Sequence, residues 1–286
     1  MFQILKKESL APQFKRYVIA APEIARKHRA GQFVLVMLHE HGERIPLTIA
    51  GSDKEAGTIT LVVQEVGKTT MEMGLMEEGD CLYAVVGPLG TPTHVERWGT
   101  VVCVGGGAGI APLLPIAKAM KEAGNRVLSI LGGRSRDLVI LREEMAALSE
   151  EMWITTDDGS LGRKGLVTHA LADVLASERP DYVVAVGPAV MMKAAAEMTR
   201  PLAIPTLCSL NTIMVDGTGM CGGCRVLVGG QPKFVCVDGP EFDAHQVDFD
   251  LLIKRLRTYL PQEQLAKQRF LESHQCVALE AAGGRV

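Results

Sequence analysis

The sequence predicts a small antiparallel β-barrel, followed by a parallel α/β sheet domain, a short cysteine-rich module and a C-terminal helix. Three observations support this fold class. Strand-like runs separated by turn residues fill the first third of the chain, strands and helices alternate from residue 98 to 210, and three cysteines fall between 221 and 236. We therefore divide the chain at 1–97, 98–210, 211–245 and 246–286.

The composition fits a globular protein with more than one core. The chain has 286 residues, 47% of them hydrophobic, which is too apolar for a disordered chain. Its 33 acidic and 30 basic residues leave a net charge of −3, so no basic excess is available to neutralise nucleic-acid phosphates. Aromatic residues make up 5%, which also disfavours base stacking. We expect no nucleic-acid partner.

The first region consists of short runs that are rich in β-branched and apolar residues. Glycine, proline, aspartate and serine separate these runs, as is typical of a small antiparallel barrel. One methionine-rich segment, 70–76, is predicted to be helical. The expected strands are 17–20, 32–37, 58–63 and 81–86, with a further β segment starting near 44–48.

The second region alternates strand and helix, which predicts a parallel, doubly wound sheet. The expected strands are 101–104, 126–131, 153–156, 182–186 and 206–209. The expected helices are 111–123, 138–149, 167–177 and 191–198.

An uncharged stretch of twenty residues at 98–117 has the length of a membrane span. It contains five glycines and two prolines, so it fits a buried strand, a glycine turn and a helix start better. The first residues lack the apolar run of a signal peptide, and the seven cysteines are an odd number. We expect a soluble cytoplasmic protein without a membrane partner.

A glycine loop follows the first strand of the α/β region and precedes a helix. Backbone N–H groups at such a turn bind a nucleotide pyrophosphate, and glycines allow the phosphate to approach closely. A tight structural turn would need the same residues, and the spacing is not that of the usual dinucleotide fingerprint. The loop consists of Gly105, Gly106, Gly107, Ala108 and Gly109. Gly187 and Pro188 follow a later strand in the same way.

Charged residues after two other strands leave the type of nicotinamide cofactor open. Arg134 and Arg136 could bind the 2′-phosphate of NADPH, or be surface residues. Asp157 or Asp158 could accept from the ribose hydroxyl of NAD(H). We favour NADH.

The cysteine cluster has the pattern Asp-x4-Cys-x2-Cys-x11-Cys, formed by Asp216, Cys221, Cys224 and Cys236. Plant-type [2Fe–2S] sites use Cys-x4-Cys-x2-Cys and a distant fourth cysteine, so aspartate stands in the first thiolate position. Interspersed glycines would allow backbone N–H groups to face sulfur. A zinc site with three cysteines is the alternative, and the x4 spacing favours iron–sulfur.

In this order the motifs resemble those of the ferredoxin–NADP reductase superfamily. The resemblance covers about residues 1–255 and is closest to two electron-transfer subunits: that of dihydroorotate dehydrogenase, and the small subunit of NADH-dependent ferredoxin–NADP oxidoreductase, also called sulfide dehydrogenase. Besides the glycine loop and the cluster pattern, its carriers are Arg44-x-Pro-x-Thr48, 66–70, 87–90, 156–159, 186–188 and 237–240.

The resemblance implies a bound FAD. Arg44 would contact the FAD phosphate, Thr48 would lie near flavin N5, and Pro46 and Leu47 between them would also bind FAD. The segment Gly67, Lys68, Thr69 and Thr70 would hold the FAD pyrophosphate at a helix N-terminus.

The implied activity is that of a redox enzyme subunit. Hydride would pass from NADH to FAD, and single electrons would pass through the cluster to a larger, glutamate-synthase-like flavoprotein with iron–sulfur clusters, with ferredoxin reached through that subunit. Such a heterodimer is compatible with electron bifurcation. An electron-transfer subunit of NAD-dependent dihydroorotate dehydrogenase is the alternative, which the aspartate at 216 disfavours. A non-enzymatic zinc-containing nucleotide-binding module is the alternative from another class.

The C-terminal region is expected to be helical from residue 247. Phe249, Leu252, Ile253, Leu256 and Leu260 share one helical face, and Pro261 either ends that helix or opens another. This helix could dock the larger subunit or cover its own core.

Overall fold

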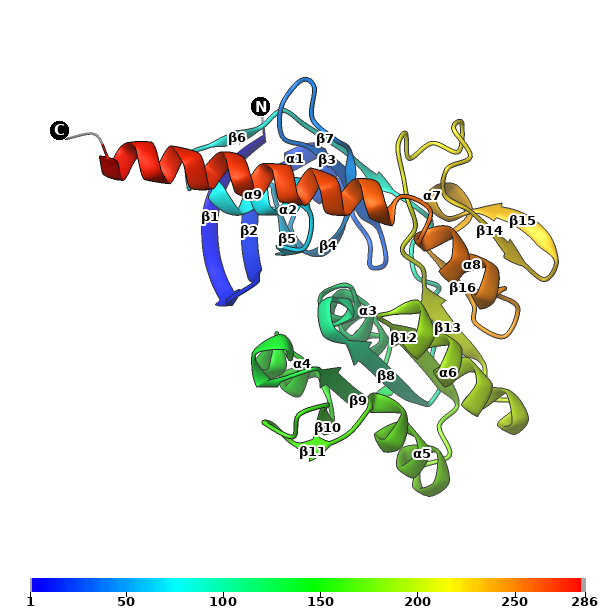
Figure 1. Ribbon diagram of the computed structural model, residues 1–286. Coiled ribbons are helices and arrows are strands. Elements are labelled where there is room, and N and C mark those ends of the chain that lie inside the picture. The colour runs from blue at the N-terminus through cyan, green and yellow to red at the C-terminus, as the bar shows by residue number, and fades with distance from the viewer. Residues whose placement is uncertain (1, 284–286) are drawn as a thin grey trace.

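The computed structural model describes residues 2–283 of the chain, with side chains through residue 273. It contains two seven-stranded sheets and one two-stranded hairpin. Figure 1 shows the barrel above the α/β domain, the hairpin and the shorter of the last two helices at the right, and the long last helix running across the barrel.

The first sheet is an antiparallel barrel with the order β6-β1-β2-β5-β4-β3-β7. The first and last strands in this order are consecutive in the chain and separated only by Tyr83, so the chain itself nearly closes the barrel. The strands are β1 (Phe2–Ala11), β2 (Phe14–Ala20), β3 (Phe33–Met37), β4 (Ile45–Asp53), β5 (Thr58–Gln64), β6 (Cys81–Leu82) and β7 (Ala84–Leu89). The helices of this region are α1 (Pro22–Lys27) and α2 (Lys68–Leu75).

Strand β1 and helix α1 are absent from the sequence prediction. In β1 only Ile4 is fully buried, and the strand carries charged residues, so it lacks a clear apolar alternation. Pairing along β2 holds it in place. The expected barrel and the helix at 70–76 are confirmed, with the helix starting two residues earlier.

The second sheet has the order β11-β10-β9-β8-β12-β13-β16 and is parallel except for β16. Its strands are β8 (Thr100–Gly106), β9 (Arg126–Gly133), β10 (Glu151–Thr156), β11 (Arg163–Lys164), β12 (Tyr182–Val186), β13 (Thr206–Ser209) and β16 (Glu241–Asp243). Its helices are α3 (Ile110–Glu122), α4 (Arg142–Leu148), α5 (Val167–Ser177) and α6 (Ala189–Thr199). The expected doubly wound sheet is confirmed, and the uncharged stretch from 98 forms β8, a short turn and the start of α3.

Alternate residues of β8 belong to two different cores. Val102 and Val104 pack with apolar residues of α5 and α6. Val101 and Cys103 pack with residues of α3 and α4. The near-continuous apolar sequence of β8 follows from this burial on both faces.

The expected helix at 138–149 is partly wrong. Residues Arg136–Leu138 form a 3-10 turn, and α4 begins only at Arg142. Leu141 between them has a φ of 54°, which breaks a helix.

The cysteine-rich segment contributes a hairpin, a short helix and an irregular loop. β14 (Arg225–Val228) pairs with β15 (Gln231–Phe234), and α7 spans Val235–Asp238. The hairpin turn is Gly229–Gly230, with both φ values positive.

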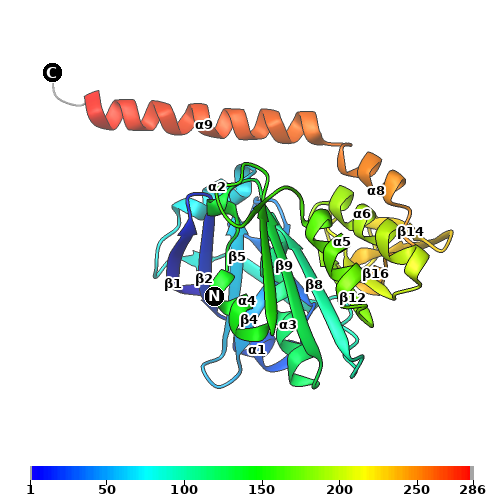
Figure 2. The same cartoon turned by 90° about the horizontal axis from the view of Figure 1, so that it is seen from below.

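Two helices complete the described chain, α8 (Phe249–Leu256) and α9 (Leu260–Gly283). Pro261 therefore lies at the start of a second helix. The single helical face expected from 249 to 260 is wrong, because α8 ends at Leu256 and Leu260 belongs to α9. Phe249 and Leu252 are buried, whereas Leu256 and Leu260 are 36% and 44% exposed. In both views α9 passes over α2 (Figures 1 and 2). Within residues 2–283, no helix combines the length and apolar character needed to span a bilayer.

One apolar core joins barrel, sheet and cysteine-rich segment. It contains Phe33 and Leu35 of the barrel strand β3, strand residues of the α/β sheet, and Met214, Cys224 and Cys236. The cysteine-rich segment is therefore packed into the molecule and cannot move freely about a linker.

Tyr17 anchors helix α2 to the barrel. Its ring is fully buried, and its hydroxyl donates to the Met73 carbonyl oxygen at 2.8 Å. We predict that Tyr17→Phe lowers the free energy of unfolding by about 0.5–1.5 kcal/mol, the value of one such hydrogen bond. Urea denaturation measures the change. Tyr83→Phe is the control, because Tyr83 is 54% exposed, and an equal loss in both variants would contradict the prediction.

Glu241 lies where the barrel, the connection after it and β16 meet. Its Oε1 accepts from Thr93 Oγ1 at 2.8 Å, and its Oε2 is buried without a partner among the described residues. A Cβ on Gly31 would lie 2.5 Å from Oε1, so the barrel backbone closes over this carboxyl. Burial raises the pKa of Glu241 to about 7.

This burial predicts a pH-dependent stability. The folded protein keeps the Glu241 proton up to about pH 7, whereas the unfolded chain releases it near 4.5. The folded state binds more protons in this window, so stability falls as pH rises through it. We predict that Glu241→Gln raises Tm at pH 8 but not at pH 4.5. Glu40→Gln, an exposed control, should change neither value. A Tm gain that is equal at both pH values would contradict the assignment.

Candidate functional site

The glycine loop lies at the point where the strand order of the parallel sheet reverses. The chain runs from β8 through β9 to β10 in one direction, then crosses to β12 on the other side of β8. Ligands of open α/β sheets bind at the carboxyl ends of strands at such a point. The structure brings Gly105–Gly109 and Gly187-Pro188 together there, because a Cβ on Gly109 would lie 2.3 Å from the Val186 carbonyl oxygen.

Individual glycines of this loop have different reasons for lacking a side chain. A Cβ on Gly106 would lie 2.5 Å from Met191 Sδ and 3.2 Å from Pro188 Cδ. Gly107 has a φ of 56° and would meet nothing within 4 Å. The open side at Gly107 and the packed side at Gly106 fit a backbone surface that a pyrophosphate can approach.

The charged loops after β9 and β10 are joined by hydrogen bonds. The Asp158 N–H donates to the Arg134 carbonyl oxygen at 3.2 Å, and the Arg136 N–H donates to Ser160 Oγ at 2.8 Å. The Asp158 carboxylate accepts from Ser160 Oγ and N–H, which lowers its pKa. Asp158 thus shapes its own loop, whereas the exposed Asp157 carboxylate makes no hydrogen bond or ion pair within the described residues.

The two FAD motifs expected in the barrel lie next to each other. Thr69 Oγ1, at the start of α2, donates to the Glu43 carboxylate, the residue before Arg44. Arg44 is exposed, whereas Pro46, Leu47 and Thr48 are half-buried on β4. Thr70 Oγ1 accepts from the N–H of Gly67, and a Cβ on Gly67 would meet nothing within 4 Å. This open helix N-terminus beside Arg44 fits a diphosphate.

Two of the four expected cluster ligands are in contact. Cys224 Sγ and Cys236 Sγ lie 3.2 Å apart, and both residues are almost fully buried. Burial raises the pKa of Cys236 to about 12. Cys221 is exposed, and its sulfur accepts from the Gly223 N–H at 3.4 Å.

Asp216 is turned toward the backbone of its own loop. Its carboxylate accepts from the N–H groups of Thr218 at 2.9 Å and Cys221 at 2.6 Å, and the Thr218 bond is the main reason its pKa is lowered. Among the described residues, no group of three His, Cys, Asp or Glu side chains is close enough to hold a metal ion. The donor set still fits a cluster chemically, because three thiols and an ionised carboxylate lie on one glycine-rich loop and its adjoining helix α7.

The loop between β13 and β14, which carries Asp216, Cys221 and Cys224 and is called here the cluster loop or cysteine loop, packs directly on the barrel. A Cβ on Gly217, whose φ is 75°, would lie 2.8 Å from Leu35 Cδ1 and 2.7 Å from Leu89 Cδ1. Leu35 pairs in turn with Pro46 across the β3–β4 ladder. Only one strand therefore separates the Arg44–Thr48 motif from the cysteine loop.

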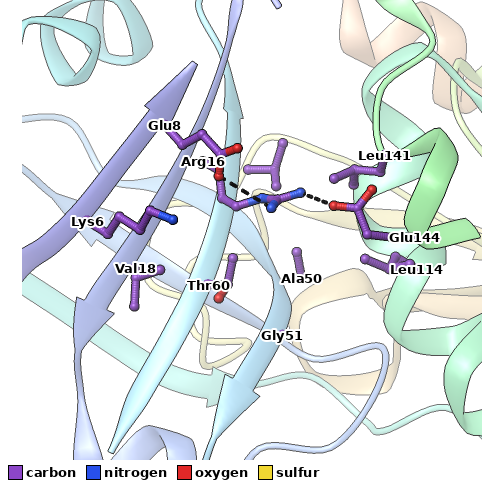
Figure 3. Close-up of a pocket in the computed structure, with 11 residues that line it drawn as sticks. Lys6, Glu8, Arg16, Val18, Ala50, Gly51, Thr60, Leu114, Leu141 and Glu144 are labelled. Carbon is purple, nitrogen blue, oxygen red and sulfur yellow. Dashed lines mark hydrogen bonds and ion pairs between the residues drawn. The ribbon is translucent and has the colours of Figure 1, made fainter. Parts of the chain in front are cut away.

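The barrel also contacts the α/β domain, at a place away from the cysteine loop. Arg16 of β2 is placed between Glu8 of β1 and Glu144 of α4 and pairs with both carboxylates (Figure 3). These residues line a cavity of about 310 Å3 that also contains Gly51 and Leu114. The ion pair ties α4 to the barrel away from the cysteine loop.

Two family models match the chain in the regions just described. Residues 103–197 match the oxidoreductase NAD-binding domain, and residues 211–248 match the iron–sulfur cluster binding domain of dihydroorotate dehydrogenase B. An electron-transfer subunit homologue of dihydroorotate dehydrogenase B (NAD(+)) from Thermotoga maritima is 49% identical over 95% of this chain and 96% of its own length. The chain belongs to this family of electron-transfer subunits.

Three further comparisons agree with the fold, and two of them also agree with the family. The electron-transfer subunit of dihydroorotate dehydrogenase B from Clostridium perfringens is 31% identical over 78% of this chain and 88% of its own. A structure of NADH-dependent reduced ferredoxin–NADP oxidoreductase, described for flavin-based electron bifurcation, is 50% identical with a TM-score of 0.89, covering 95% of this chain and 98% of that one. The Amycolatopsis cytochrome P450 reductase GcoB, 24% identical with a TM-score of 0.58 over 70% of this chain and 65% of its own, shares the fold alone. The resemblance expected from the sequence is confirmed, and the iron–sulfur match favours that cluster over the zinc alternative.

Several residues that connect the sites were missed from the sequence. Leu35 and Leu89 look like ordinary strand residues, and Glu43, which accepts from Thr69 of the expected FAD segment, belongs to no motif. Their importance comes from contacts between segments far apart in the chain, for which the sequence offers no signal.

Asp216 has a direct test. We predict that Asp216→Ala changes the electron paramagnetic resonance spectrum of the reduced, anaerobically purified protein, because it removes an oxygen donor from the cluster loop. Asp243→Ala is the control, since Asp243 lies outside the loop. An unchanged spectrum in Asp216→Ala would refute the assignment of Asp216 as a ligand.

Proposed function

We propose that this chain is the electron-transfer subunit of an NADH-dependent ferredoxin–NADP oxidoreductase. NADH gives up two electrons and a proton as hydride, and the acceptor in a larger partner subunit receives the electrons one at a time. FAD supplies two-electron exchange with nicotinamide and one-electron exchange with a [2Fe–2S] cluster. The 50% identical ferredoxin–NADP oxidoreductase structure supports this assignment over the dihydroorotate alternative, which Asp216 disfavours.

Each site residue receives a specific role in this proposal. Arg44 and Gly67–Thr70 hold the FAD diphosphate, and Thr48 faces the reacting edge of the flavin. Gly105–Gly109 and Gly187-Pro188 hold the NADH pyrophosphate, with Arg134 and Asp157 at the adjacent loops and Asp158 shaping them. Asp216, Cys221, Cys224 and Cys236 bind the cluster.

One observation carries the proposal: the contact of Gly217 with Leu35. Leu35 of β3 touches Gly217 of the cluster loop and pairs with Pro46 of β4, the strand that carries the expected FAD motif. The cluster loop and this motif are therefore separated by one residue of β3. Electron transfer between two bound centres requires short separation and a fixed geometry, and packing of Leu35 in a common core supplies the rigidity.

The family of electron-transfer subunits implies a larger partner subunit. We propose that this partner is a glutamate-synthase-like flavoprotein with iron–sulfur clusters, that the heterodimer performs electron bifurcation, and that ferredoxin is reached through the partner. We also place the protein in the cytoplasm, where the six cysteines described as free thiols would stay reduced. Affinity purification of the native complex identifies the partner, and a dihydroorotate dehydrogenase subunit in its place would refute this part.

The basic function is tested by visible absorption of the anaerobically purified chain. We expect flavin bands near ~450 nm and a broad iron–sulfur shoulder, both bleached by NADH. A colourless protein that carries zinc would refute the proposal.

The contact that carries the proposal is tested with two matched glycine variants. Gly217→Ala and Gly230→Ala both place a side chain at positive φ, which costs about 1–2 kcal/mol, but only Gly217→Ala clashes with Leu35. We predict that NADH bleaches the flavin at the wild-type rate in both variants, whereas the cluster is reduced more slowly in Gly217→Ala alone. Stopped-flow absorption separates the two phases. Equal cluster-reduction rates in both variants would contradict the proposed route.

A further inference from the structure

A cavity of about 410 Å3 lies between the cysteine loop and helix α8. Its lining includes Cys221 and the guanidinium-bearing residues Arg225 and Arg255, together with apolar residues of α8. No carboxylate is among its lining residues. Positive charge therefore faces the cysteine loop from the α8 side.

Arg255 contacts the loop through the carbonyl between two cysteines. Its Nη2 donates to the Gly223 oxygen at 3.0 Å, in a partly buried contact. Arg225 Nη1 donates to the preceding carbonyl, that of Gly222, at 3.3 Å. The two arginines thus bind the carbonyl oxygens of the two glycines between Cys221 and Cys224.

Holding these carbonyls also orients the N–H groups that follow them. In a trans peptide the C=O and N–H bonds point in opposite directions. The Gly223 N–H, whose preceding carbonyl Arg225 holds, points to Cys221 Sγ at 3.4 Å. By the same geometry, the Arg255 contact with the Gly223 carbonyl points the Cys224 N–H away from Arg255.

The Arg255 position is fixed by the fold of α8. Asp248 caps the helix by accepting from the Leu251 N–H at 2.9 Å, and Leu252 is buried in the common core. Among the described residues Arg255 makes no ion pair, so its charge is not neutralised by a neighbouring carboxylate. A guanidinium also stays charged at all working pH values.

We propose that Arg255 is a positioning residue of the cysteine loop that favours the reduced state of the cluster, an inference that rests on the proposed function. A reduced cluster carries one more negative charge, which a nearby positive charge stabilises, and N–H groups aimed at sulfur act in the same direction. Arg255 stabilises the reduced cluster in two ways. It orients the Gly223–Cys224 peptide, and the electrostatic field of its guanidinium lowers the energy of the added negative charge.

The test is a redox titration of the full-length, anaerobically purified protein, followed by electron paramagnetic resonance. Arg255→Gln should lower the equilibrium constant for cluster reduction about tenfold, which is about 59 mV for a one-electron couple. Arg255→Lys keeps the charge but loses the planar donor, so its midpoint should lie between wild type and Arg255→Gln. Lys254→Gln removes an equal charge from the exposed neighbouring position and should leave the midpoint unchanged. The flavin midpoint should be unchanged in all three variants.

The outcomes separate this inference from the proposed function. A wild-type midpoint in Arg255→Gln overturns the role of Arg255 while leaving the function intact. Absence of any iron–sulfur signal in the wild-type protein refutes the function and this inference with it. If Arg255→Gln loses the cluster, Arg255→Lys decides: a midpoint below wild type supports the inference, and a wild-type midpoint overturns it.

Discussion

The arrangement of the molecule depends on the contact between Leu35 and Gly217. Leu35 belongs to the barrel strand next to the flavin motif, and it packs with Cys224 and Cys236 in one apolar core. Gly217 approaches Leu35 so closely that no side chain fits between them. Because packed cores are rigid, this contact sets the separation between the Arg44–Thr48 strand and the loop that carries Asp216 and Cys221.

The topology of the parallel sheet supplies the second constraint. The strand order reverses at β8, and Gly109 can pass under the Val186 carbonyl only without a side chain. The α/β domain is tied to the barrel by the ion pair between Arg16 and Glu144, and Glu241 of β16 bonds to Thr93 beside Gly31 of the barrel region. These contacts fix the α/β domain against the barrel and lie outside both expected nucleotide motifs.

Much of the fold was predictable because its signals are local. β8 reads as a strand since both of its faces are buried, and Gly105–Gly109 reads as a phosphate loop since it joins that strand to a helix. β1 was not predictable, because pairing with β2 rather than its own alternation holds it. The break at Leu141 was also missed, because a left-handed leucine is imposed by surrounding packing.

The sequence by itself determined the family and the three kinds of site, because phosphate loops and cysteine spacing depend on neighbours along the chain. Only the tertiary structure decided how the sites face one another. Leu35 beside Gly217, Glu43 beside Thr69, and Arg255 beside Gly223 join segments distant in sequence. Such contacts arise from burial of common apolar surface and satisfaction of polar groups at the edges of that core, which local spacing cannot encode.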